Sequence, residues 1–238
     1  MEKPYARIYE GTGWLEPMFS YAQNFEDVTL RRALLDINDG FYIDIGGYHP
    51  RSHSVTKHFY DKGWTGINVE PNPGLLSQFV AERPNDTNIG VAVGRENAKV
   101  DLHIIGTTGL TTTVESVALG HASLGHAITS VLPVQMVTLE TLFESYCGPR
   151  TVDFLKVDVE CAEADVVLAC GFEKYRPRIL VIENSPGYHE YLLIKGYVFC
   201  WFDGLNRWYV RQEDEWRADL VARPPCIWDQ ISNIQRSE

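Results

Sequence analysis

The sequence predicts an α/β fold with a mostly parallel sheet, flanking helices and an antiparallel hairpin near the C-terminus. Apolar runs rich in Val and Ile alternate with segments of helical spacing, which is typical of β-α-β units. Close to the end, residues 203–206 ("DGLN") separate two further apolar runs, and Asp-Gly favours the tight turn of a hairpin. There is no internal repeat and no low-complexity linker, so we expect residues 1–238 to form a single domain.

The predicted strands are short runs rich in β-branched or aromatic residues. In chain order they are residues 41–45, 66–70, 88–93, 100–105, 134–138, 152–159 and 178–183, followed by the hairpin strands 197–202 and 207–211. The predicted helices are residues 24–35, 55–62, 75–82 and 162–169. Ser54 is the expected N-cap of the second helix, and Gly63 and Pro84 end the second and third.

One long segment does not fit this pattern. Residues 106–133 are rich in small residues and weakly periodic, with the stretches "GTTGLTTTV" and "GHASLGHA". Loops of this length inside a compact domain are usually lids or binding loops, so we expect a substrate or lid loop here. Residues 1–20 are expected to form an N-terminal extension.

Charge and composition argue against several classes of protein. Acidic residues outnumber basic ones by 32 to 21, and the net charge of -11 disfavours a nucleic-acid partner or an anionic membrane surface. No apolar run approaches the ~18 residues needed to cross a bilayer. The five cysteines are scattered and form no C-x-x-C, which is typical of reduced packing thiols. We therefore expect a cytoplasmic protein without membrane insertion.

The stretch "YIDIGGYHP" places Asp44, Gly46 and Gly47 at the end of the first strand of the predicted sheet. In an open α/β sheet, ligands bind beyond the carboxyl ends of the strands, and glycines there let a ligand approach the backbone. Glu70 ends the next strand, where a carboxylate can accept hydrogen bonds from ribose hydroxyls. Asp-x-Gly-Gly alone is also common in tight turns, but the joint spacing with Glu70 favours a nucleoside site.

The kind of nucleoside follows from the neighbouring residues. A dinucleotide fingerprint starting at Gly46 needs glycine at positions 48 and 51, where this chain has Tyr48 and Arg51. The carboxylate of Asp44 attracts a cation and repels phosphate. S-adenosylmethionine carries an ammonium, a sulfonium and a ribose but no phosphate, and it fits these residues. An NAD-dependent oxidoreductase and a non-catalytic module are the alternatives from other classes.

Five stretches occur in one order along the chain: "YAQNFEDV" (21–28), "YIDIGGYHP" (42–50), "GWTGINVEPNP" (63–73), "VDFLKVDVECAE" (152–163) and "DGLNRWYV" (203–210). Together they resemble the FkbM-type S-adenosylmethionine-dependent methyltransferases, over most of the chain. The resemblance implies a Rossmann-like methyltransferase fold and methyl transfer to a hydroxyl, commonly on a sugar, glycan, glycolipid or polyketide.

The resemblance also implies roles for single residues. The cofactor-binding residues that it indicates are Gln23, Asn24, Asp44, Gly46, Gly47, Glu70, Pro71 and Asn72. Glu70 matches the ribose-binding acid, while Gln23 and Asn24 lie in a segment expected to close over the cofactor. Cys161 stands where the family usually has a glycine, so the backbone at this position must accommodate a Cβ atom.

Methyl transfer requires that the acceptor hydroxyl lose its proton to a base or to a bound metal. Asp158 lies at the carboxyl end of one predicted strand, and Glu183 and Asn184 lie at the end of the next, so these oxygen ligands should share one rim of the sheet. Such a set suits Mg²⁺, which prefers hard oxygen ligands. The alternative is that Asp158 orders its loop, while Glu183 and Asn184 bind substrate hydroxyls directly.

The candidate catalytic residues are Asp158, Glu160, His49 and His189. His49 lies in the predicted cofactor loop, His189 follows the strand over residues 178–183, and Glu160 is two residues beyond Asp158. The expected acceptor is a sugar, an oligosaccharide or a glycolipid precursor, because polar loops and a metal suit vicinal hydroxyls. A polyketide or another natural product with a free hydroxyl is the alternative acceptor. Assembly of the protein as a homodimer is also left open.

Overall fold

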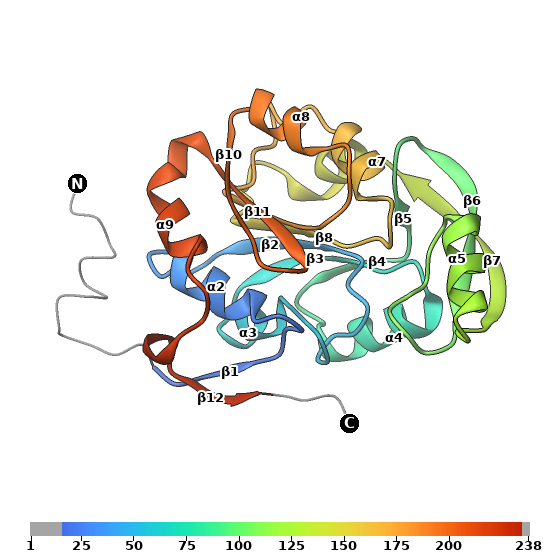
Figure 1. Ribbon diagram of the computed structural model, residues 1–238, viewed down its shortest axis with the longest axis horizontal. Coiled ribbons are helices and arrows are strands. Elements are labelled where there is room, and N and C mark those ends of the chain that lie inside the picture. Colours follow the sequence, from blue (N-terminus) through green and yellow to red (C-terminus); the bar gives the residue numbers. More distant parts are fainter. Residues whose placement is uncertain (1–15, 235–238) are drawn as a thin grey trace.

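The computed structural model describes residues 16–234 of the chain. Its centre is a seven-stranded sheet with the order β10-β11-β9-β8-β2-β3-β4 (Figure 1). The strands are β2 (Phe41–Ile45), β3 (Thr65–Val69), β4 (Thr87–Ile89), β8 (Phe154–Val157), β9 (Ile179–Glu183), β10 (Tyr197–Phe202) and β11 (Asn206–Arg211). The first five are parallel to one another, and β11 is antiparallel to both of its neighbours. The predicted mixed α/β class is confirmed.

The central strands of this sheet are buried on both faces. Side chains alternate sides along each strand, so each strand contributes to two cores. Ile43 and Ile45 belong to one apolar core, and Tyr42 belongs to the other. Figure 1 shows α7 and α8 on one side of the sheet and α2 and α3 on the other. The helices that contribute to the first core are α6 (Leu139–Leu142), α7 (Glu163–Leu168) and α8 (His189–Ile194), and those of the second are α2 (Glu26–Ala33), α3 (Lys57–Asp61) and α9 (Ala218–Val221).

The segment predicted as a long loop is mostly regular structure. A second sheet has the order β5-β7-β6, with β5 (Ala92–Val93), β6 (Ala98–Ile105) and β7 (Ile128–Val137), and helix α5 (Glu115–Ser123) lies between β6 and β7. The prediction of a loop over residues 106–133 is therefore wrong for the residues of α5 and for the first part of β7. Pairing with β6, which runs from Ala98↔Met136 to Ile105↔Ile128 with a register shift between Ile104 and Ile105, orders a segment whose own periodicity is weak.

Other predicted bounds need smaller corrections. The strand predicted over residues 88–93 is two strands in different sheets, β4 and β5. The four predicted helices are present as α2, α3, α4 (Pro73–Glu82) and α7. Helix α4 begins two residues early, because the side chain of Asn72 caps it by accepting a hydrogen bond from Gly74 N at 3.0 Å.

The ends of the described chain meet in a small parallel sheet of β1 (Met18–Ser20) and β12 (Ile231–Ile234). Part of the predicted extension over residues 1–20 is thus a strand, and residues 1–15 lie outside the described part. The remaining elements are short: the π-helix η1 (Phe143–Cys147) and the 3-10 helices η2 (Gln212–Arg217) and η3 (Ile227–Asp229). Among the described residues, no helix is long and apolar enough to span a bilayer.

Candidate active site

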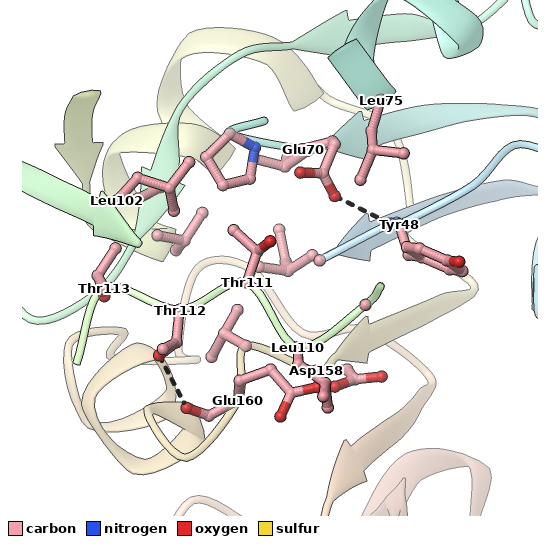
Figure 2. Close-up of a pocket in the computed structure, with 18 of the residues that line it drawn as sticks. Tyr48, Glu70, Leu75, Leu102, Leu110, Thr111, Thr112, Thr113, Asp158 and Glu160 are labelled. Carbon is pink, nitrogen blue, oxygen red and sulfur yellow. Dashed lines mark hydrogen bonds between the residues drawn. The ribbon is translucent and has the colours of Figure 1, made fainter. Parts of the chain in front are cut away.

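A cavity of about 500 Å³ opens at the carboxyl ends of β2, β3 and β8 (Figure 2). The chain runs from β2 to β3 on one side and returns to β8 on the other, so the cavity lies where the strand order reverses. This is the position at which open α/β sheets bind ligands. The polar lining comes from Gln23, Tyr48, His53, Glu70, Lys156, Asp158, Glu160 and the threonines within residues 107–113.

The turn after β2 requires glycine at one position. Gly46 has a φ of 77°, and a Cβ atom there would lie 1.7 Å from the carbonyl oxygen of Asp158. The N–H groups of Gly46 and Gly47 both donate to Val69 O, at 3.0 and 3.2 Å. These N–H groups are already paired within the protein, so Gly46 serves close packing between the β2 and β8 loops. Gly46 lines the cavity, whereas Gly47 packs against Phe79.

Glu70 is held at the end of β3 by two backbone hydrogen bonds. Its Oε2 accepts from Tyr48 N at 3.0 Å and its Oε1 from Asn72 N at 2.8 Å. Glu70 is only 5% exposed, and burial raises the pKa of its carboxyl to about 7. Pro71 also lines the cavity. The Glu70 carboxylate is therefore fixed at the cavity, and each of its oxygens can accept a further hydrogen bond from a ligand.

The segment before α2 meets the cavity through one residue. Gln23 lines it, whereas the Asn24 side chain turns away and donates to Asp203 O at 3.4 Å. Asn24 thereby links this segment to the turn between β10 and β11. The structure places Gln23 against the cavity and Asn24 in a structural contact.

Lys156, which sequence reasoning missed, organises the floor of the cavity. Its Nζ lies 3.5 Å from Asp44 Oδ1 and 3.2 Å from Asp158 Oδ2, and it donates to Gly46 O at 2.8 Å. Burial alone would lower the pKa of Lys156, but the charges of Asp158 and Asp44 outweigh burial and raise it. Asp44 is 1% exposed and does not line the cavity. Its carboxylate thus acts on the site through Lys156.

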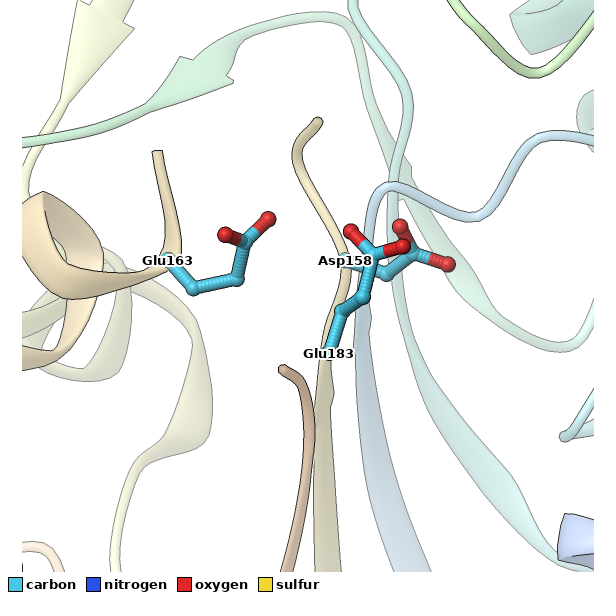
Figure 3. Close-up of side chains that lie close together, drawn as sticks. All are labelled: Asp158, Glu163 and Glu183. Carbon is cyan, nitrogen blue, oxygen red and sulfur yellow. The ribbon is translucent and has the colours of Figure 1, made fainter. Parts of the chain in front are cut away.

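An acidic cluster lies beside the cavity where β8 and β9 end. One carboxylate oxygen from each of Asp158, Glu163 and Glu183 lies within 4.8 Å of the other two (Figure 3). Burial, followed by the charges of Asp158, Glu160 and Glu163, raises the pKa of Glu183 to about 8. Burial and the charges of Asp158 and Glu163 likewise raise the pKa of Glu160 to about 7. Negative charge in this region exceeds what its neighbours neutralise.

The loop between β8 and α7 has an unusual backbone. Glu160 and Cys161 have φ values of 56° and 74°, in the left-handed region that favours glycine. The exposed Cys161 side chain occupies the position where the resemblance implies a glycine. Thr112 donates to Glu160 O at 3.2 Å, and His121 Nε2 of α5 lies 3.9 Å from the Glu160 carboxylate. The segment between β6 and β7 therefore packs directly on this loop.

Three further predicted site residues, two candidate bases and one candidate metal ligand, also have structural partners and do not line the cavity. The Nδ1 atom of His49 accepts from the backbone N–H groups of Arg51 and Ser52, both at 3.0 Å. His189 Nδ1 shares a hydrogen bond of 2.9 Å with the Tyr209 hydroxyl. Asn184 Oδ1 accepts from Arg207 Nε at 2.6 Å. The third carboxylate of the acidic cluster comes instead from Glu163, which sequence reasoning did not single out.

The fold and the cavity together define the class of the protein. It is an α/β protein with a cavity at the point where the strand order of its main sheet reverses. A family model, the Methyltransferase FkbM domain, matches residues 44–198, which is more than half of the chain. The chain belongs to this methyltransferase family, as the sequence resemblance indicated. Searches of curated proteins and of solved structures found no match.

Proposed function

We propose that this protein is an S-adenosylmethionine-dependent O-methyltransferase with a Rossmann-like arrangement, acting on a hydroxyl of a sugar, an oligosaccharide or a glycolipid precursor. The observation that carries the proposal is the cavity at the carboxyl ends of β2, β3 and β8 in a chain of the methyltransferase family. The antiparallel β11 beside β9, with β10 at the edge, supports the Rossmann-like assignment.

The cavity fits the proposed cofactor in charge. S-adenosylmethionine brings a transferable methyl group on a sulfonium and no phosphate. The lysine that lines the cavity, Lys156, is already paired with two carboxylates, so it is not available as a phosphate anchor. Glu70 offers lone pairs to vicinal ribose hydroxyls, and its two backbone hydrogen bonds fix it before the ligand arrives.

The opposite side of the cavity carries the groups that can handle the acceptor. Figure 2 shows Asp158 and Glu160 across the cavity from Glu70, with Thr111 and Thr112 between them. Either carboxylate can accept the proton of an acceptor hydroxyl held beside it. His49 and His189 are less suitable as bases, because the Nδ1 atom of each is already hydrogen-bonded and neither residue lines the cavity.

The lining of the rim favours a polar acceptor. Threonines at positions 107, 108, 111, 112 and 113 line the cavity and can hydrogen-bond sugar hydroxyls. Leu102 and Leu110 also line it, and this apolar contribution supports a polyketide or similar natural-product hydroxyl as the second candidate. The net charge of -11 disfavours strongly anionic acceptors in both cases.

Calorimetric titration of the full chain with S-adenosylhomocysteine tests the proposal, with NAD⁺ as the comparison ligand. We expect saturable binding of S-adenosylhomocysteine and none of NAD⁺. Glu70→Ala should weaken binding at least tenfold, because charge-assisted hydrogen bonds to ribose are lost. Glu82→Ala, which removes an exposed carboxylate on α4, is the matched control and should bind normally. Binding of NAD⁺ instead of S-adenosylhomocysteine would overturn the proposal.

The acceptor is tested separately by methyl transfer from labelled S-adenosylmethionine to two panels of compounds. One panel contains neutral sugars and oligosaccharides, and the other contains hydroxylated polyketide-like compounds. Labelling of the first panel supports the proposed acceptor class, and labelling confined to the second selects the alternative.

A further inference from the structure

We propose that Asp158, Glu163 and Glu183 form a binding site for a hard divalent cation beside the cavity. The three residues come from different elements: Asp158 directly follows β8, Glu163 opens α7, and Glu183 is the last residue of β9. They converge because β8 and β9 are adjacent parallel strands, so their carboxyl ends meet at one edge of the sheet. The cation site stands on this geometry, and its role in catalysis rests on the proposed function.

The spacing of the oxygen atoms is close to what one cation spans. The three ligand atoms lie within 4.8 Å of one another. Two oxygens on opposite sides of one Mg²⁺ are about 4.2 Å apart, and the corresponding span for Ca²⁺ is about 4.6–5.2 Å. Three oxygens at this separation lie close to the span of one cation, and an inward movement of the side chains would bring all three within bonding distance of Mg²⁺, Mn²⁺ or Ca²⁺.

Glu163 supplies the independent observation that something is missing from the cluster. Its side chain is fully buried, and its Oε1 accepts from Val159 N at 3.0 Å. Its Oε2 is buried and has no hydrogen-bond partner. Figure 3 shows this carboxylate on the side of the Glu163 side chain that faces Asp158 and Glu183. A buried carboxylate oxygen without a partner is unfavourable, and a cation between the three residues would satisfy it.

The local charge balance points the same way. Lys156 is the ammonium nearest to Asp158, at 3.2 Å, but it is shared with Asp44 and with Gly46 O. Glu160 adds a fourth carboxylate to this end of the sheet. One shared ammonium therefore faces the excess charge, and a divalent cation would balance it.

The donor set and the exposure define what the cation would do. Carboxylate oxygens alone select Mg²⁺, Mn²⁺ or Ca²⁺ over softer metals. The Asp158 side chain is 32% exposed and lines the cavity, so the side of the site toward the cavity is open. A cation bound there would lower the pKa of an acceptor hydroxyl that reaches it.

The test uses the full chain stripped with EDTA and titrated with Mn²⁺, followed by electron paramagnetic resonance, and then with Mg²⁺ and Ca²⁺ as competitors. We expect one saturable Mn²⁺ site, with the stronger competitor identifying the preferred ion. Glu163→Gln should weaken Mn²⁺ binding at least tenfold, because Gln keeps the hydrogen bond to Val159 N but removes the charge. Glu183→Gln is the second variant, should Glu163→Gln fail to fold.

Two control variants make the assignment specific. Asp165→Asn removes an acidic side chain from the same helix, outside the cluster, where it pairs with Arg95, and should leave Mn²⁺ affinity unchanged. Asn184→Ala should also leave it unchanged, because the Asn184 oxygen is bound to Arg207. A loss of Mn²⁺ affinity in Asn184→Ala but not in Glu163→Gln would overturn the ligand set.

The failure of this inference can be told apart from that of the proposed function. If S-adenosylhomocysteine binds in EDTA but no saturable Mn²⁺ site exists, the cation site is wrong and the methyltransferase proposal stands. If Mn²⁺ binds equally well to wild type, Glu163→Gln and Glu183→Gln, the cation sits elsewhere and the inference is overturned. If Mn²⁺ binds as expected while S-adenosylhomocysteine does not, the site holds and the proposed function fails.

Discussion

The two ends of strands β8 and β9 carry similar numbers of charged groups, but these groups are paired at one end and mostly unpaired at the other. At the amino ends, Asp153 directly precedes β8 and Arg178 directly precedes β9, and they pair at 2.9 Å. Asp214 joins them, with Arg178 at 2.9 Å and Arg211 at 2.6 Å. At the carboxyl ends, three carboxylates converge beside one shared lysine. The same two strands thus have a neutralised end and an acidic end.

The two ends differ in whether their charged side chains are paired within the protein. Paired charges stabilise the fold, whereas we expect the unpaired carboxylates to bind a ligand. At the amino end each carboxylate has a guanidinium, and Asp153 also accepts from Phe41 N at 2.9 Å. At the carboxyl end Glu163 keeps an unpartnered buried oxygen. A carboxylate that is paired with a guanidinium of the same chain already has its countercharge. A buried carboxylate without one is stabilised when a cation or a cationic ligand binds beside it. We therefore expect the carboxyl end to be the functional end.

The largest expected effect is at the acidic end. Asp158→Asn should lower methyl-transfer turnover by about 10³-fold, because the cavity loses a carboxylate that can accept a proton or bind a cation. Binding of S-adenosylhomocysteine should change by less than about threefold, because Glu70 and its backbone partners remain in place. Initial rates and calorimetry on the same preparations check both values, with Asp165→Asn as the control. Turnover retained in Asp158→Asn would contradict the assignment.

The next effect is at the neutralised end and concerns stability. Asp214→Asn should lower the free energy of unfolding by about 3 kcal/mol, because it leaves the partly buried guanidinium of Arg211 without a countercharge and removes one of the two carboxylates that pair with Arg178. Urea denaturation measures the loss, and affinity for S-adenosylhomocysteine should not change.

Glu213 provides the matched control for Asp214. It is the neighbouring residue, its side chain is 55% exposed, and it pairs with Arg176. Glu213→Gln should cost no more than about 1 kcal/mol, because solvent screens an exposed pair. Equal losses in the two variants would show that burial does not distinguish the pairs, and the contrast between the two ends would lose its energetic basis.

The sequence predicted the elements whose pattern is local. The bounds predicted for strands β2 and β9 and for helices α2 and α7 were close to the observed ones, because short continuous apolar runs mark strands buried on both faces and a period of 3.6 marks helices. Helix α5 and the start of β7 were missed. Ala118 is the buried residue of α5, so this helix has no apolar stripe to reveal it. Strand β7 depends on pairing with β6, which is a tertiary effect that local spacing does not encode.

The site was predictable to the level of strand ends but not of side-chain contacts. Alternation placed Asp158 and Glu183 at adjacent strand ends, and the structure brings their carboxylates together. Lys156 was missed, although a lysine inside the buried run "FLKV" was a signal that a countercharge lay nearby. Asn184 was expected beside these acids, but its pairing with Arg207 depends on the register of β11 against β9, which the sequence does not specify.

The smallest expected effect concerns Glu70, a carboxylate at the same end of the sheet that already has partners. Burial raises the pKa of Glu70 to about 7; its backbone hydrogen bonds and Lys156 oppose this shift, and Asp44 adds to it. Ribose hydroxyls donate to the ionised form, so affinity for S-adenosylhomocysteine should be full above pH 7. It should fall as pH drops through 7, by at most about tenfold per pH unit.

Calorimetry between pH 5.5 and 8.5 in buffers of constant ionic strength measures this profile. Glu70→Gln, which carries no ionisable carboxyl, should bind weakly at every pH and lose the dependence. If the slope persists in Glu70→Gln, a group other than Glu70 titrates, and Glu160 and Glu183, whose pKa values burial raises to about 7 and about 8, are then the first candidates. Cofactor affinity would then depend on the unpaired carboxylates near the end of β8 and not on Glu70, which the backbone fixes.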